Sequence, residues 1–257
     1  MGVVNVTPDS FSDGGLYFDP EAAIDHGRRL LAEGADILDV GGESTAPGAT
    51  AVPVEEELRR VEPVVAALAA GGVAVSIDTT KAAVAAAALD AGAAIVNDVT
   101  ALRGDPEMAA LCAERGAPVI LMHMLGSPRT MQDDPRYGEV VDDVRAFLAE
   151  RLAAALAAGI DEELIWLDPG IGFGKTVDHN LELLRRLGEL GELGRPLVVG
   201  TSRKRFIGGI DGSPPGERLG GTIASSLLAA ANGAAVLRVH DVAEMRQALR
   251  VADAVLG

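Results

Sequence analysis

The chain has 257 residues, 48% of them hydrophobic and only 3% aromatic, which is enough apolar material for one large domain with an aliphatic core. Its 22 basic and 38 acidic residues give a net charge of −16, which argues against nucleic acid or an anionic membrane as the main partner. No apolar run reaches membrane-spanning length, no secretory signal opens the chain, and the single Cys112 excludes an internal disulfide and suits a reducing, cytoplasmic location. Because residues 2–6 already read as a strand, we expect a few native residues ahead of Met1.

Short apolar runs alternate with longer helical patterns along the whole chain. The predicted strands are 2–6, 37–40, 73–77, 94–97, 119–122, 165–167, 197–199 and 235–239. The predicted helices are 20–33, 54–70, 81–91, 106–115, 137–158, 180–193, 217–232 and 242–256. The strands read as apolar on both faces, as expected for parallel strands beneath covering helices. The pattern predicts an α/β fold, a single-domain (β/α)8 TIM barrel over residues 1–257, in preference to an open doubly-wound sheet, because no Gly-x-Gly-x-x-Gly follows the first strand.

Polar residues gather where the predicted strands end. Asp168, followed by proline and glycine, closes the sixth strand, because proline removes a ladder donor and restricts the residue before it. The seventh predicted strand, 197–199, is likewise followed by polar residues, Ser202, Arg203 and Lys204. In a barrel, chemistry gathers on the loops after the strands' C-terminal ends, so these residues predict one functional site. A carboxylate beside a cation-rich loop suits a polar heterocycle held next to an anionic leaving group.

Eight motifs occur in order along the chain. They are Asn-Val-Thr-Pro-Asp-Ser-Phe-Ser-Asp-Gly-Gly, Gly-Gly-Glu-Ser-Thr-x-Pro-Gly, Ser-Ile-Asp-Thr, Val-Asn-Asp-Val, Met-His-Met, Asp-Pro-Gly-Ile-Gly-Phe-Gly-Lys, Ser-Arg-Lys-Arg-Phe-Ile-Gly and Arg-Val-His-Asp-Val. Together they resemble the dihydropteroate synthase family over nearly the whole chain. The resemblance implies a cytoplasmic, homodimeric TIM barrel that is a target of sulfonamides. It also implies the condensation of 6-hydroxymethyl-7,8-dihydropterin diphosphate with p-aminobenzoate, with Mg²⁺ as cofactor.

The resemblance also assigns roles to individual residues. Residues at pterin-binding positions are Asp78, Asn97, Asp168, Lys204 and Arg238. Residues at diphosphate-binding positions are Asn5, Thr45, Arg238 and His240, with Asn5 also the Mg²⁺ ligand. Residues at p-aminobenzoate positions are Phe11, Thr45, Pro47, Phe173 and Lys204. Residues expected to act in catalysis are Asp13, Asp78, Lys204 and Arg238, in a reaction in which diphosphate leaves before the arylamine attacks.

One residue departs from the family pattern. Ala46 stands where the family usually has arginine, so we expect an intact pterin site but a weaker or altered arylamine site, with Lys204 and Arg205 as compensating cations. Two alternatives stay open at this point. One is a pterin-binding paralogue with another arylamine or no catalysis, and the other is a methyltetrahydrofolate-type methyltransferase domain.

Overall fold

The computed structural model describes residues 1–7, 19–45 and 48–257. It has an α/β fold in which eight parallel strands form one sheet in the order of the chain. The strands are β1 (Gly2–Asn5), β2 (Ile37–Gly41), β3 (Ala74–Asp78), β4 (Ile95–Asp98), β5 (Val119–Met122), β6 (Ile165–Asp168), β7 (Leu197–Val199) and β8 (Ala234–Leu237). Parallel neighbours need a crossover connection, and helices supply it after each strand.

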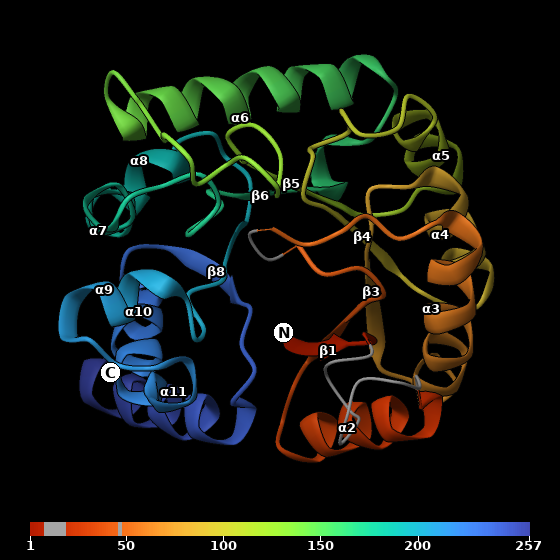
Figure 1. Cartoon of the computed structure of the whole chain (residues 1–257), viewed down its shortest axis with the longest axis horizontal. Helices are drawn as coiled ribbons and strands as arrows, with labels where there is room; N and C mark the ends of the chain where they lie inside the picture. The colour runs from red at the N-terminus through yellow and green to blue at the C-terminus, as the bar shows by residue number, and fades with distance from the viewer. Residues whose placement is uncertain (8–18, 46–47) are drawn as a thin grey trace.

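The helices lie around the outside of the sheet, which curls through the centre of the molecule (Figure 1). They are α2 (Pro20–Ala32), α3 (Val54–Ala69), α4 (Ala82–Asp90), α5 (Met108–Arg115), α6 (Val140–Ala157), α7 (Val177–Arg185), α8 (Leu187–Gly191), α9 (Arg205–Asp211), α10 (Leu219–Ala231) and α11 (Val242–Leu256), with short 3₁₀ turns at Glu162–Leu164 and Pro215–Glu217. Within the described ranges, no helix is both long enough and apolar enough to cross a membrane.

The two ends of the sheet are joined by backbone hydrogen bonds. Val3 N donates to Val239 O at 3.0 Å, and Val239 N donates to Met1 O at 2.9 Å. The terminal ammonium of Met1 donates to Leu237 O at 2.9 Å. The first strand therefore pairs with β2 on one side and with the chain leaving β8 on the other.

Several helix ends are fixed by their own sequence. The Asp19 side chain accepts from Glu21 N, and Pro20 occupies the first turn of α2, where its missing N–H is not needed. Thr176 and His179 form a reciprocal capping box at the start of α7. Gly116 ends α5 in the left-handed conformation. Local sequence thus sets where these crossovers begin and end.

The two faces of the strands differ. One set of alternate residues, including Leu38, Val40 and Leu167, packs in the large core shared with the helices. The other set forms a smaller cluster around Ile120 and Val198, and nearer the C-terminal strand ends this face turns polar. The expectation of strands that are apolar on both faces was therefore wrong for their C-terminal halves.

Most predicted elements are confirmed to within three residues, and Cys112 is buried in α5 as expected. The predicted helix 180–193 is instead two helices that meet at Arg186, whose φ of −107° and ψ of 23° leave the helical range. Glycines at 188 and 191 weaken helix propensity there. Helix α9 was not predicted, because its sequence holds two adjacent glycines and only seven residues.

Candidate active site

A pocket of about 760 Å³ lies at the C-terminal ends of the strands. The predicted site residues in its wall are Asn5, Thr45, Asp78, Phe173, Lys204, Arg238 and His240. Asn97 and Asp168 are not in the wall. Asn97 donates to Asp39, which accepts from the wall residue Arg238, and the charge of Asp168 acts on the wall residue Lys204. Phe11, Asp13 and Pro47 lie outside the described residues, as does Ala46. Seven of the predicted site residues therefore line one pocket at the strand ends.

Arg238 lies between two buried carboxylates from other strands. Its Nε donates to Asp39 Oδ2 at 2.6 Å, and its Nη2 donates to Asp78 Oδ2 at 2.9 Å. Asn97 Nδ2 donates to the same Asp39 oxygen at 3.1 Å. Burial opposes the charge of Arg238, but Asp39 and Asp78 outweigh it and hold the Arg238 pKa above its ordinary value. Burial raises the pKa of Asp78 to about 7, against the attraction of Arg238.

Two further charged residues act on one another near the pocket: Asp168 at the end of β6 and Lys204 in the segment after β7. Asp168 is 7% exposed, and its Oδ1 accepts from Gly170 N at 2.7 Å. Burial raises the Asp168 pKa, although Lys204 opposes the shift. Burial lowers the Lys204 pKa to about 8, and Asp168 opposes that shift in turn. Lys204 Nζ lies 4.6 Å from the centre of the Phe173 ring. The Lys204 ammonium therefore lies over the Phe173 ring in the pocket wall, and the negative charge of Asp168 acts on it.

The loop after β6 is held through its carbonyl groups. Lys204 Nζ donates to Ile171 O, and Gln132 Nε2 donates to Gly172 O at 2.7 Å. The next two carbonyls, of Phe173 and Gly174, accept from Lys175 Nζ at 3.0 Å and from the Tyr137 hydroxyl at 2.7 Å. Each donor is a side chain, and three of the four come from outside the loop. The loop is therefore fixed before any ligand arrives.

His240 is paired with Ser202 across β7 and β8. Ser202 Oγ lies 2.9 Å from His240 Nδ1, and His240 N donates to the same Oγ at 3.2 Å. Because Ser202 Oγ accepts from His240 N, the Ser202 hydroxyl hydrogen donates to His240 Nδ1. The other ring nitrogen of His240 then carries the proton, so Nε2–H remains as a donor. Burial and the nearby Arg238 lower the His240 pKa to about 4. His240 thus suits an anion as a neutral N–H donor.

His123 has a supporting role at the end of β5. Its Nδ1 lies 2.8 Å from Lys175 Nζ, and both side chains are buried. Burial lowers the His123 pKa to about 2 and brings the Lys175 pKa well below its usual range. The pair thus joins the end of β5 to the loop after β6.

The described donor set has few metal ligands. Within residues 1–7, 19–45 and 48–257, no three His, Cys, Asp or Glu side chains group in a way that could hold a metal ion. Asn5 is exposed in the pocket wall and offers one amide oxygen. This set fits a hard cation that keeps most of its water and takes further oxygens from a phosphate ligand.

Sequence reasoning missed several residues that position the site. Asp39, Gln132 and Lys175 were given no role, and Ser202 was predicted only as part of a strand-end loop; each bonds to a predicted site residue or to the loop after β6. Asp39 carried a signal, since it is a charged residue within an otherwise apolar strand. Gln132 carried none, because its partner is a backbone carbonyl 40 residues away.

Comparison with known proteins gives a consistent result. The sequence matches the family model of pterin binding enzymes over residues 1–240. It is 48% identical over 258 residues to the dihydropteroate synthase of Escherichia coli, a match that covers 100% of this chain and 91% of that protein. A probable bifunctional folylpolyglutamate synthase/dihydropteroate synthase of Haloferax volcanii is 51% identical over 252 residues, which are 98% of this chain but 30% of that longer protein.

Solved structures agree with these relatives. Xanthomonas albilineans dihydropteroate synthase with 4-aminobenzoic acid has a TM-score of 0.94 and 53% identity, covering 100% of this chain and 92% of that one. The same enzyme with 7,8-dihydropteroate has a TM-score of 0.90 and 49% identity, covering 100% of this chain and 93% of that one.

The glycine at the start of the loop after β6 gives a first prediction. A Cβ on Gly170, whose φ is +66°, would lie 1.8 Å from His123 O, whereas one on Gly194, whose φ is +74°, would meet nothing within 4 Å. We expect Gly194→Ala to lower the free energy of unfolding by about 1 kcal/mol through backbone strain alone. Gly170→Ala should lower it by about 4 kcal/mol or more, because the clash is with backbone. Urea denaturation measures both, and equal effects would contradict the geometry.

Asp39 gives a second prediction. It is 0% exposed and pairs with Arg238, so Asp39→Asn should lower the free energy of unfolding by about 3 kcal/mol. The matched control is Asp90→Asn, which breaks a pair of similar length with Arg115 on the surface and should leave stability unchanged. If the two variants unfold at the same denaturant concentration, Asp39 is not an essential partner of Arg238.

Proposed function

The chain belongs to the family of pterin binding enzymes, and on that premise we propose that it is a dihydropteroate synthase. It is a transferase that condenses 6-hydroxymethyl-7,8-dihydropterin diphosphate with p-aminobenzoate to give 7,8-dihydropteroate and diphosphate. The observation that carries this function is the group of buried carboxylates, an amide and two cations at one end of the sheet. Such a group matches a heterocycle with many donors and acceptors joined to an anionic leaving group.

The pterin is the ligand for the buried polar groups. Its edge resembles that of guanine, and a carboxylate such as Asp168 accepts two parallel N–H bonds from such an edge. Asn97 supplies a mixed donor and acceptor, and Asp78 a further acceptor. Lys204 caps the ring carbonyl and ring nitrogen, and the planar Arg238 stacks on the ring. The short contacts around Arg238 support this proposal, since they fix the plane of the guanidinium.

The diphosphate lies toward the pocket mouth. Asn5, Thr45, Arg238 and His240 form its binding group, and all four line the same pocket. Asn5 would hold Mg²⁺ through its amide oxygen, and the bound ion would neutralise charge on the leaving group. His240 donates from Nε2 to a phosphate oxygen, because Ser202 occupies Nδ1.

The reaction begins with loss of diphosphate. The bond between the pterin methylene carbon and the diphosphate oxygen breaks, and its electron pair leaves with the diphosphate. The arylamine nitrogen then forms the new bond to the methylene carbon and loses a proton to solvent or to the departing diphosphate. Arg238 stabilises the charge on the leaving group, while Asp78, with Asp13, stabilises the pterin cation. Because a cation exists before the amine attacks, no strong general base is needed.

The arylamine site is formed by Phe11, Thr45, Pro47, Phe173 and Lys204. Of these, Thr45, Phe173 and Lys204 lie together in the pocket wall. The contact of Lys204 with the Phe173 ring supports a site that accepts an aromatic ring beside a positive charge. Ala46 removes a cation from this region, so we propose weaker p-aminobenzoate binding than in relatives with arginine there.

The proposal extends to architecture and assembly. Backbone bonds between β1 and the chain after β8 support a closed, single-domain (β/α)8 TIM barrel over residues 1–257. Exposed apolar side chains on neighbouring helices support a homodimer; these are Ile210, Leu228, Val251, Val255 and Leu256, on α9, α10 and α11 (Figure 1). A cytoplasmic location rests on the single buried cysteine.

A binding-only paralogue is the second candidate, and the direct assay separates it from the synthase. We expect dihydropteroate and pyrophosphate to form together when the protein is given the dihydropterin diphosphate, Mg²⁺ and p-aminobenzoate. Product is followed by chromatography and pyrophosphate by a coupled assay. Tight pterin binding with no arylamine-dependent product would overturn the synthase and favour the paralogue. The methyltransferase alternative is disfavoured, since the relatives reported above are synthases.

Lys204 sets a pH dependence. Burial lowers its pKa to about 8, so its positive charge is lost as the pH rises through that value. We therefore expect kcat/KM for the pterin substrate to fall above about pH 8. Lys204→Arg should have lower activity but no such fall, because a guanidinium keeps its proton. A fall that persists in Lys204→Arg would assign the titration to another group.

A further inference from the structure

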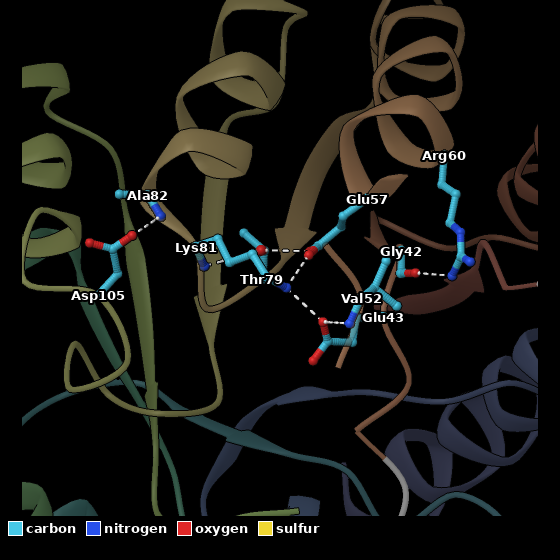
Figure 2. Close-up of polar contacts among 9 residues, drawn as sticks. All are labelled: Gly42, Glu43, Val52, Glu57, Arg60, Thr79, Lys81, Ala82 and Asp105. Carbon is cyan, nitrogen blue, oxygen red and sulfur yellow. Dashed lines mark hydrogen bonds and ion pairs between the residues drawn. The ribbon is translucent and has the colours of Figure 1, made fainter. Parts of the chain in front are cut away.

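A charged cluster lies beside the pocket and is not used by the chemistry above. Lys81, which precedes α4, has its Nζ 2.5 Å from Glu57 Oε2 and 2.6 Å from Glu43 Oε2. Thr79 Oγ1 donates to the other oxygen of Glu57 at 2.7 Å. Figure 2 shows Lys81 between the two glutamates, one from α3 and one from the segment after β2. A single cation thus joins two consecutive crossovers of the fold, the one between β2 and β3 and the one between β3 and β4.

The two carboxylates differ in burial. Glu57 has a side-chain exposure of 0%, and Lys81 and Thr79 engage both of its oxygens. Without Lys81, this carboxylate would be a buried, unpaired charge, which is strongly destabilising. Glu43 has a side-chain exposure of 23%, so water can replace Lys81 as its partner. The contact with Glu57 is therefore needed by the fold, whereas the contact with Glu43 is not.

Glu43 fixes the chain that carries Thr45. The Oε2 atom that pairs with Lys81 also accepts from Val52 N at 2.9 Å. One carboxylate therefore fixes both the residue where the chain leaves β2 and the residue where it approaches α3. Arg60 adds a second fixed point through a 2.9 Å bond from its Nη1 to Gly42 O (Figure 2). Glu43 and Thr45 both line the pocket.

We propose that Lys81 and Glu43 are positioning residues that set where Thr45 stands in the pocket wall and so set the affinity for the arylamine. This inference rests on the proposed function, since it assigns Thr45 to the arylamine side of the pocket. The pterin side depends on Asp39, Asp78 and Arg238, whose hydrogen bonds do not include the cluster. Because Thr45 is also proposed to bind the diphosphate, the matched readout on the pterin side is a pterin without diphosphate. Disturbing Glu43 should therefore raise KM for p-aminobenzoate and leave unchanged the Kd of 6-hydroxymethyl-7,8-dihydropterin.

The test compares Glu43→Gln with Glu57→Gln in the full chain. Glu43→Gln should raise KM for p-aminobenzoate about tenfold, because small misplacements in a site have effects of at least this size. Its kcat, its Kd for 6-hydroxymethyl-7,8-dihydropterin without diphosphate and its Tm should stay close to wild type, with Tm within about 2 °C. Glu57→Gln should lower Tm by roughly 10 °C or fail to fold. A change in that Kd equal to the change in KM for p-aminobenzoate, or no change in KM for p-aminobenzoate, would overturn the proposal.

Two further variants test whether the effect on KM comes from the position of Thr45 or from a change in net charge. Lys81→Arg can still form both ion pairs, so KM for the arylamine should stay within about threefold of the wild-type value. Glu139→Gln is the matched control, since it removes the same charge from a glutamate that pairs with Arg186 but is not in the pocket wall. It should leave both KM values unchanged, and a tenfold rise there would assign the effect to net charge.

A measurement without turnover keeps this inference distinct from the proposed function. The Val52 amide bonds to Glu43, so Glu43→Gln should speed its hydrogen exchange, while amides of β3 and β4 exchange as in wild type. If wild type makes no dihydropteroate but Val52 loses protection, the positioning contact stands and the assigned reaction fails. If Val52 exchange is unchanged in the variant, the positioning contact is wrong whatever the activity.

Discussion

The site depends on one buried guanidinium held between two buried carboxylates. Arg238 is 199 residues from Asp39 and 160 from Asp78, yet it bonds to both. Such a charge inside a protein is tolerated only when it is paired, and the same holds for each carboxylate. The pairing therefore fixes side chains of the proposed pterin site and ties the chain after β8 to β2 and β3.

The pocket carries charges of both signs. Of the described residues, two acidic side chains line it, Glu43 and Asp78, and five basic ones, Lys175, Arg203, Lys204, Arg205 and Arg238. A carboxylate held in place beside a developing cation stabilises it, and cations held in place stabilise a departing anion. In the proposed reaction, Asp78 stabilises the pterin methyl cation, and Asn5, Arg238 and His240 hold the diphosphate. Separate groups of residues in one pocket thus suit separate stages of the proposed reaction.

Features that depend on neighbouring residues could be predicted from the sequence, whereas contacts between distant residues could not. Strand ends such as Asp168-Pro169-Gly170 were found, because proline and glycine act on neighbouring backbone. Asp39 was given no role in the site, because its partner Arg238 is 199 residues away in the sequence. Lys81 and Glu43 were missed for the same reason, since nothing local marks a lysine that bridges two distant acids. The break at Arg186 was missed because the apolar pattern continues across it.

The joining of β1 to the chain after β8 has a consequence for synthesis of the protein. Val3 and Val239 are hydrogen-bonded, and Arg238 lies in the same segment as Val239, so the pocket cannot assemble until the residues up to 239 have left the ribosome. Contacts between such remote residues slow folding and leave apolar strands uncovered in the meantime. The net charge of −16 then has a consequence unrelated to catalysis. Electrostatic repulsion between incompletely synthesised chains opposes their association before β8 has been made.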